Sequence, residues 1–307
     1  VEPAEGEVRS MPASWMEHEG MVYDFGNFIR ATEGYIRTEV AYPGGAVIDN
    51  YGTETSVSAD KSWLNYDGSD TPPEGAKVTF ELYADGEAAK HTDGSVVKSI
   101  VLDGTVDEGF TETSVEGECA AWKATWKNLP AYKTENDQLV KDDQGNYVKI
   151  AYTVKEKGID LPADSYASYT SEAKDEAVVA THTEPAKITN TQKTGELTIS
   201  KTVISDAAAD KDAKFSFTVK LSDTTITHAF ETDVDKKTVQ FTNGESATIE
   251  LKGGESLTIK GLPLGVGYTV TEAEATGFKL TGKTGDAGKI TATKSEAELI
   301  NTRKTGD

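Results

Sequence analysis

Two short motifs each occur twice in this chain of 307 residues. Asn-Thr-x-Lys-Thr-Gly begins at Asn190 and again at Asn301. Tyr-Thr-Val-x-Glu precedes each copy, at 152–156 and at 268–272. Motifs that recur in a fixed order indicate tandem domains.

A strand-like stretch that contains a lysine opens each repeat, VSADKSW at 57–63 and LTISKTV at 197–203. The repeats predict one domain over 56–193 and a second over 194–307, with a short polar linker between them. Residues 1–55 fit neither copy. They contain several aromatic residues, so we expect a β-rich segment there, either separate or an incomplete part of a preceding domain, which we leave unassigned.

Alternating apolar and polar residues recur in short segments through both repeats. Such alternation is typical of strands with one buried face, and Asp-Gly, Asn-Gly and Gly-Gly pairs separate the segments. Only residues 206–213 could form a helical turn. The sequence therefore predicts an all-β chain of tandem β-sandwiches. The clearest strand candidates are 77–84, 148–154, 195–203, 214–221 and 255–262.

The charge balance excludes several classes of function. Acidic residues number 52 against 31 basic ones, and the formal net charge is −21. A polyanion repels nucleic-acid phosphates and anionic membranes. No apolar run approaches the roughly 20 residues that span a bilayer, so we expect no membrane insertion. The single Cys119 cannot form an internal disulfide or a cysteine-rich zinc site.

Strand parity places charged residues on apolar rows. In 197–203, Lys201 shares its face with Leu197 and Ile199, because alternate residues of a strand point the same way. The other motif residues behave alike. One lysine, one glutamate and one asparagine are expected to point inward in each repeat: Lys61, Glu156 and Asn190 in the first, and Lys201, Glu272 and Asn301 in the second.

Each residue alone has an ordinary explanation. A lysine can extend its ammonium to water, a glutamate can lie at a rim, and an asparagine can cap a turn. Three such residues in the same order in two repeats need a common cause, because burying charges is costly.

The chemistry of these side chains supplies a cause. Desolvation lowers the pKa of a lysine and raises that of a carboxylic acid. A neutral lysine amine is a nucleophile, and a protonated glutamate can polarise an asparagine carboxamide and relay protons. Attack of the amine on the carboxamide would expel ammonia and leave an amide. Proximity in a folded core favours such a single-turnover reaction.

The chain resembles two families of Gram-positive surface domains. Residues 56–193 are similar to collagen-adhesin B-type (CnaB) domains through Lys61-x-Trp63, FELYADG at 80–86, WKATWKNLPAY at 122–132, YTVKE and ITNT. Residues 194–307 resemble the pilin isopeptide-linkage domain through LTISKTV, KFSFTVKL, YTVTE and the closing NT, with 242–263 between them.

The resemblance implies transthyretin-like or Ig-like sandwiches with spontaneous intramolecular isopeptide bonds. It makes Glu156 and Glu272 the catalytic residues. It joins Lys61 to Asn190 and Lys201 to Asn301.

The resemblance also implies a place and partners. We expect an extracellular protein at the cell wall or surface of a Gram-positive bacterium, whose partners are other domains or subunits of the same assembly. No LPxTG-type sorting signal is present, so we expect a piece of a longer protein, with sortase-mediated attachment through other parts. The segment 39–45 is only partly similar to the lysine motif used by sortases, because Gly44 stands at the lysine position.

The function implied is a structural stalk or pilus module, without enzymatic turnover. The alternative is a ligand-binding adhesin that contacts a host or matrix molecule through residues 1–55 or the insertion at 85–121, which we interpret as a solvated loop. No carboxylate pair stands out to support a glycosidase. No cofactor is expected. Two acidic turns, 65–70 and 142–146, contain calcium-type oxygen ligands but lack EF-hand spacing.

Overall fold

The chain groups into two compact units. The computed structural model describes residues 11–12, 35–42, 45–91, 94–105, 107–112, 115–136 and 138–303, and the side chains of 53–91, 94–105, 121–136 and 138–303. Unit 1 comprises residues 1–60, 79–157 and 176–187, and unit 2 comprises 61–78, 158–175 and 188–307. The domain limits at 55/56 and 193/194 stay predictions.

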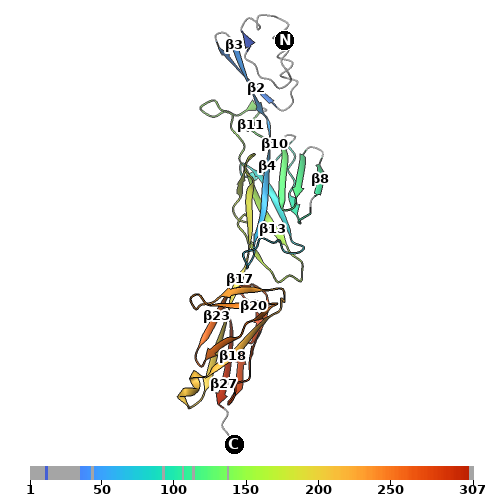
Figure 1. The fold of residues 1–307 in the computed structure, drawn as a ribbon. Coiled ribbons are helices and arrows are strands. Elements are labelled where there is room, and N and C mark those ends of the chain that lie inside the picture. The colour runs from blue at the N-terminus through green and yellow to red at the C-terminus, as the bar shows by residue number, and fades with distance from the viewer. Residues whose placement is uncertain are drawn as a thin grey trace. The chain divides into compact units, whose positions relative to one another are not determined.

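The all-β fold class is confirmed, because strands form nearly all of the regular structure that is described (Figure 1). A sheet at the start of the chain has the order β1 (Met11–Pro12), β3 (Gly45–Gly52), β2 (Tyr35–Tyr42). The described part of residues 1–55 is thus β-structured. The one helix of the described chain is a 3-10 turn, η1 (Ala208–Asp212), inside the segment where a helical turn was predicted.

Two larger sheets contain the motifs of the first repeat. The six-stranded sheet has the order β14 (Tyr169–Ser171), β16 (Ala186–Gln192), β4 (Glu54–Leu64), β10 (Lys123–Pro130), β9 (Val115–Ala120), β8 (Asp107–Glu112). The five-stranded sheet has the order β15 (Val178–Ala180), β13 (Tyr152–Asp160), β5 (Lys77–Ala84), β6 (Glu87–Ala88), with β7 (Ile100–Leu102) beside β5. A small ribbon pairs β11 (Thr134–Glu135) with β12 (Gln138–Leu139). β13 begins at Tyr152, four residues later than the predicted strand at 148–154.

The interpretation of 85–121 as a solvated loop is wrong. The segment supplies β6, β7, β8 and β9, and Ile100 and Leu102 of β7 are buried. The strands β9 and β10 pair in antiparallel fashion up to a turn at 121–122, which extends the six-stranded sheet. The segment escaped prediction because its strands are short and their alternation covers too few residues to stand out.

Unit 2 contains a sandwich of two sheets. One sheet has the order β23 (Ser256–Pro263), β17 (Thr194–Ile204), β27 (Ser295–Arg303), β25 (Phe278–Thr284). The other has the order β19 (His228–Glu231), β20 (Thr238–Thr242), β21 (Glu245–Ser246), β18 (Lys214–Leu221), β24 (Gly267–Glu272), β26 (Ala287–Lys289), with β22 (Ile249–Lys252) beside β18. Apolar rows of both sheets form one core, including Leu197, Ile199, Leu257 and Leu299 from the first and Phe215, Phe217, Val219 and Val270 from the second.

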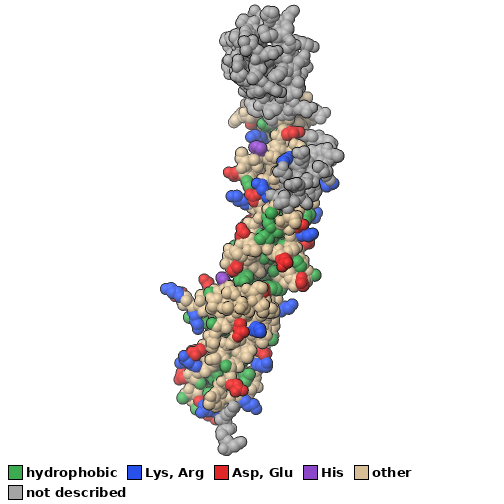
Figure 2. Space-filling view, turned by 45° about the vertical axis from the view of Figure 1, so that its right-hand side comes forward, with side chains coloured by type: hydrophobic (Ala, Val, Ile, Leu, Met, Phe, Trp, Pro, Cys, Tyr) green, Lys and Arg blue, Asp and Glu red, His purple; other side chains and the backbone are tan. Residues whose placement is uncertain are grey.

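Polar residues cover the outside of these sheets. Figure 2 shows lysine, arginine, aspartate and glutamate side chains spread over the described surface, with smaller apolar patches between them. The turns follow the sequence closely. Asn243 and Gly244, which join β20 to β21, have φ values of 50° and 78°, as a tight Asn-Gly hairpin requires.

The turn after β25 tolerates glycine alone. Gly285 has φ 63°, and a Cβ there would lie 2.0 Å from the backbone oxygen of Glu296. Gly254 also has a positive φ, 84°, but a Cβ there would meet nothing within 4 Å. The two positions share the backbone strain and differ in the clash.

We therefore expect Gly285→Ala to lower the melting temperature far more than Gly254→Ala. The shared left-handed conformation costs about 1 kcal/mol, and the clash adds about 1–3 kcal/mol at Gly285 only. Thermal unfolding followed by circular dichroism measures both variants. Equal decreases would show that β27 moves away from this turn at little cost.

Candidate functional site

The site in unit 2 lies where a parallel strand pair faces the second sheet. Lys201 lies on β17 and Asn301 on β27, and these strands run parallel, with Lys201 opposite Leu299 and Asn301 opposite Val203. Glu272 ends β24 in the other sheet. Inward strand faces thus bring one residue from each of three strands into the core.

The Lys201 ammonium is completely buried. Its side chain is 0% exposed, and Nζ lies 3.1 Å from Glu272 Oε2. Nζ also donates a hydrogen bond of 3.2 Å to the backbone oxygen of Leu299, and it lies 4.5 Å from the ring centroid of Phe215. Burial lowers the pKa of Lys201, and the contact with Glu272 opposes this effect. The amine is therefore closer to its neutral, nucleophilic form than a surface lysine is.

Glu272 contacts both partners through its two oxygens. Oε2 faces Lys201, and Oε1 accepts a hydrogen bond from Nδ2 of Asn301. The Glu272 side chain is 2% exposed, and Asn301 is 2% exposed. One carboxyl group therefore bridges the amine and the carboxamide away from water.

The oxygen of the Asn301 carboxamide, Oδ1, is buried on the other side of that group. Among the described residues, no protein group donates a hydrogen bond to this oxygen. A half-turn of the carboxamide exchanges the oxygen and the nitrogen within the same volume. Oδ1 then faces Glu272 and can accept a proton from its carboxylic acid form. The arrangement can thus activate the carbonyl and the amine together.

The first repeat buries the equivalent residues. Lys61 is 6% exposed, Asn190 0% and Glu156 2%. Lys61 lies on β4 and Asn190 on β16, which are neighbours in one sheet of their repeat, as β17 and β27 are in the second. Lys61 Nζ lies 4.3 Å from the Trp63 ring centroid and donates a hydrogen bond of 2.6 Å to the backbone oxygen of Ser62. Glu156 is buried on β13.

The inward orientation predicted for all six side chains is confirmed by their burial. Their roles as cross-linked and catalytic residues stay predictions. Sequence reasoning did not single out Phe215, whose ring covers the Lys201 amine. Its place in the alternating stretch 214–221 marks it as a core residue, but nothing local shows that it meets a lysine from another strand.

In each of the two acidic turns with calcium-type ligands, one carboxylate accepts hydrogen bonds from backbone nitrogens of the same turn. Asp142 Oδ1 accepts hydrogen bonds from the backbone nitrogens of Gln144 and Asn146, at 3.0 and 2.8 Å. Asp67 Oδ1 accepts one from the backbone nitrogen of Ser69 at 3.0 Å. These are the usual bonds of acidic turns.

Neither a metal-binding cluster nor a membrane-spanning helix is found among the described residues. Within them, no three or more His, Cys, Asp or Glu side chains gather in a way that could hold a metal ion. No helix in this part of the chain has the length and apolar character needed to cross a membrane. Of the segment 39–45, which is partly similar to the sortase lysine motif, residues 43–44 lie outside the described residues.

A family model matches most of the second repeat. Residues 195–303 match a family model described as a domain of unknown function (DUF7601). The pilus tip adhesin Cpa of Streptococcus pyogenes is 39% identical over 113 residues, which are 35% of this chain and 16% of Cpa. This chain therefore covers about a sixth of the length of that relative.

Matches among solved structures include two major pilins of Streptococcus pyogenes. The T-13 pilin matches with a TM-score of 0.42 and 19% identity, over 82% of this chain and 98% of the pilin. The T3.2 pilin matches with a TM-score of 0.43 and 19% identity, over 82% of this chain and 99% of the pilin.

The buried pair predicts a specific pattern of stabilities. In an Asn301→Ala background, which lacks the carboxamide, Glu272→Gln should lower the free energy of unfolding by about 3–5 kcal/mol, because it leaves the Lys201 charge unpaired. Adding Lys201→Met should recover most of this loss, because the charge is then gone. Urea unfolding of the three proteins measures both steps. If Lys201→Met gave no recovery, the ion pair would not be what Glu272 contributes.

Proposed function

We propose that this chain is a structural segment of a bacterial pilus or surface adhesin, closed by self-formed lysine–asparagine isopeptide bonds. One observation carries the proposal: the Glu272 carboxyl group contacts both the Lys201 amine and the Asn301 carboxamide in the dry core of unit 2. A carboxyl group in this position can relay a proton between the amine and the carboxamide.

The proposed reaction balances without an outside reagent. The neutral amine of Lys201 attacks Cγ of Asn301, while the Glu272 acid polarises the carbonyl. The new Nζ–Cγ bond forms, the Cγ–Nδ2 bond breaks, and Glu272 carries a proton from the amine to the leaving nitrogen. Ammonia departs and an amide remains. Each chain reacts once per site, so the protein has no turnover as an enzyme.

The same step is proposed for the first repeat, with Lys61, Asn190 and Glu156. The two bonds would enclose loops of about 130 and about 100 residues. In the chain-entropy model, cross-links of this span stabilise a fold by about 5 kcal/mol each. An amide also resists reduction, which suits an extracellular protein.

The parallel register supports a mechanical role. β17 and β27 pair from Leu197 with Ser295 to Ile204 with Thr302. Tension on the two ends of the second repeat would enter β17 at its start and leave β27 at its end, so it would shear this pair along its length. A bond from Lys201 to Asn301 would carry that force covalently and bypass the rest of the sandwich.

The similarity to Cpa supports a place at the cell surface of a Gram-positive bacterium. We propose that the partners are other domains or subunits of the same assembly, and that sortase-mediated attachment uses parts outside this chain. No feature of the described residues favours the alternative of a ligand-binding region at 85–121, which forms strands of the sheets.

Intact-mass measurement of the denatured chain tests the proposal directly. We expect a deficit of two ammonia molecules relative to the sequence. Glu272→Ala and Glu156→Ala should each restore one, because each removes the acid of one site. The proposal fails if the unchanged chain has the plain mass of its sequence.

Glu274→Ala provides a matched control for Glu272→Ala. Glu274 lies two residues further along the chain and is exposed. Its removal changes the net charge equally and should leave the deficit intact. A smaller deficit in this control would mean that acidic charge, rather than the Glu272 site, governs the loss of ammonia.

The pH dependence of ammonia loss should show a broad plateau. The reactive form has a neutral Lys201 and a protonated Glu272, and it holds one proton, as the ion pair does. The fraction of molecules in the reactive form is therefore independent of pH while the two residues together hold one proton. A second proton stops the reaction in acid, and loss of the proton stops it in alkali. Because burial lowers the pKa of Lys201, the alkaline fall should lie below the usual pKa of lysine. A rate that keeps rising towards that pKa would contradict a role for the Glu272 proton.

A further inference from the structure

The faces of β17 and β27 do not by themselves fix which residues react. A shift of β27 by two residues along β17 leaves every side chain on its own face. It moves Asn301 by about 7 Å, given a rise of about 3.3 Å per residue. That displacement would remove the carboxamide from Glu272, so the site needs something that sets the register of these two strands.

Arg303 makes a contact at the end of β27 that can set this register. It lies two residues beyond Asn301, and its Nη1 is 3.0 Å from Asp210 Oδ1 in the turn that follows β17. Asp210 also accepts a hydrogen bond from the hydroxyl of Ser205, the residue just after β17. The end of β27 is therefore tied to the segment that directly follows the lysine strand.

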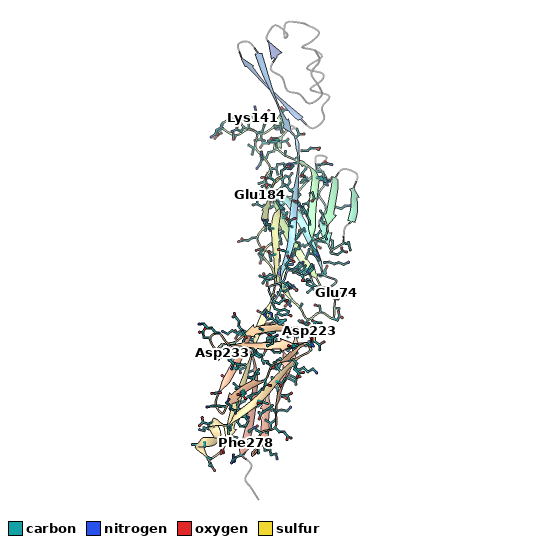
Figure 3. All side chains as sticks on the ribbon, viewed as in Figure 1. Glu74, Lys141, Glu184, Asp223, Asp233 and Phe278 are labelled. Atoms are coloured by element: carbon teal, nitrogen blue, oxygen red, sulfur yellow. The ribbon has the colours of Figure 1, made fainter. Side chains whose placement is uncertain are left out.

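A series of ring contacts links this ion pair to the reacting lysine. The Arg303 guanidinium carbon lies 5.3 Å from the ring centroid of Phe278, its cross-strand neighbour on β25. Figure 3 shows Phe278 at the end of unit 2 where β27 finishes. The Phe278 and Phe215 centroids are 5.1 Å apart, and Phe215 covers the Lys201 amine.

In the first repeat, the residue that corresponds to Arg303 makes a similar contact through a hydrogen bond in place of an ion pair. Gln192 lies two residues beyond Asn190, and its Oε1 accepts a hydrogen bond of 3.1 Å from the backbone nitrogen of Tyr66. Tyr66 lies just after β4, the strand that contains Lys61. In both repeats the second residue after the asparagine reaches the segment that follows the lysine strand.

We propose that Arg303 and Asp210 are positioning residues for the reaction of Lys201 with Asn301. They form a latch, the ion pair Arg303–Asp210, which fixes β27 in the register that brings Asn301 to Glu272. This inference rests on the proposed function, because it concerns the rate of that cross-link.

The exposure of the latch separates this role from a structural one. The Arg303 side chain is 50% exposed and that of Asp210 11%. Ion pairs with an exposed partner contribute little to stability. A merely structural latch would therefore change little when removed, whereas a positioning latch changes the rate of ammonia loss.

The experiment follows ammonia loss in the full chain after brief cell-free synthesis, with aliquots denatured and weighed over time. Proteolytic digestion then identifies the branched peptide that joins β17 to β27. This peptide shows which part of the ammonia loss belongs to the bond between Lys201 and Asn301. Arg303→Met and Asp210→Asn remove the latch, and Arg303→Lys retains its charge. Lys283→Met is the matched control, because it removes an exposed ion pair, with Asp286, beside β27 but outside the latch.

We expect Arg303→Met and Asp210→Asn to slow the formation of the bond between Lys201 and Asn301 roughly tenfold or more. A small misplacement of reacting groups has effects of this size. Arg303→Lys should restore most of the rate, and Lys283→Met should leave it unchanged. Urea unfolding of Arg303→Met in the Glu272→Gln background should differ little from that of Glu272→Gln alone, which shows that the fold itself is retained.

Three outcomes would overturn the inference. Normal rates in both Arg303→Met and Asp210→Asn would do so while leaving the proposed function intact. Slowing by Lys283→Met to the same extent would show a general charge effect. Absence of ammonia loss in the unchanged chain would remove the proposed function and this inference with it.

Discussion

A lysine and a glutamate held side by side in a dry core constrain the whole of unit 2. Taking two opposite charges out of water costs several kcal/mol, which only close geometry and further hydrogen bonds offset. Lys201 Nζ lies 3.1 Å from Glu272 Oε2. Lys201 also donates a hydrogen bond to the backbone oxygen of Leu299, and Glu272 accepts one from the carboxamide of Asn301. The strands β17, β24 and β27 must therefore meet in one arrangement for the core to remain satisfied.

Much of this arrangement could be predicted because it depends on neighbours in the sequence. Strand alternation has a period of two, so the inward face of Lys201 follows from Leu197 and Ile199 nearby. The turn at Asn243 and Gly244 follows from the left-handed conformations that these residues tolerate. The repeat of the motifs indicates which three inward polar residues belong together in each domain.

What escaped prediction depends on residues far apart in the chain. The parallel register of β17 with β27 pairs positions about 100 residues apart in the chain. The alternation of faces along a strand does not distinguish registers that differ by two residues. Phe215 over Lys201 and Arg303 against Asp210 are likewise contacts between separate strands and turns. The strands at 85–121 were missed for another reason, since Ile100 and Leu102 form a buried row too short to give a pattern.

The parallel neighbours β17 and β27 are the first and last strands of their sandwich. With the proposed amide between them, the chain is branched, and residues 201–301 form a closed ring. A single cut by a protease within that ring would open a loop without separating the two ends of the protein. A cut that divides an ordinary chain would leave this one in a single covalent piece.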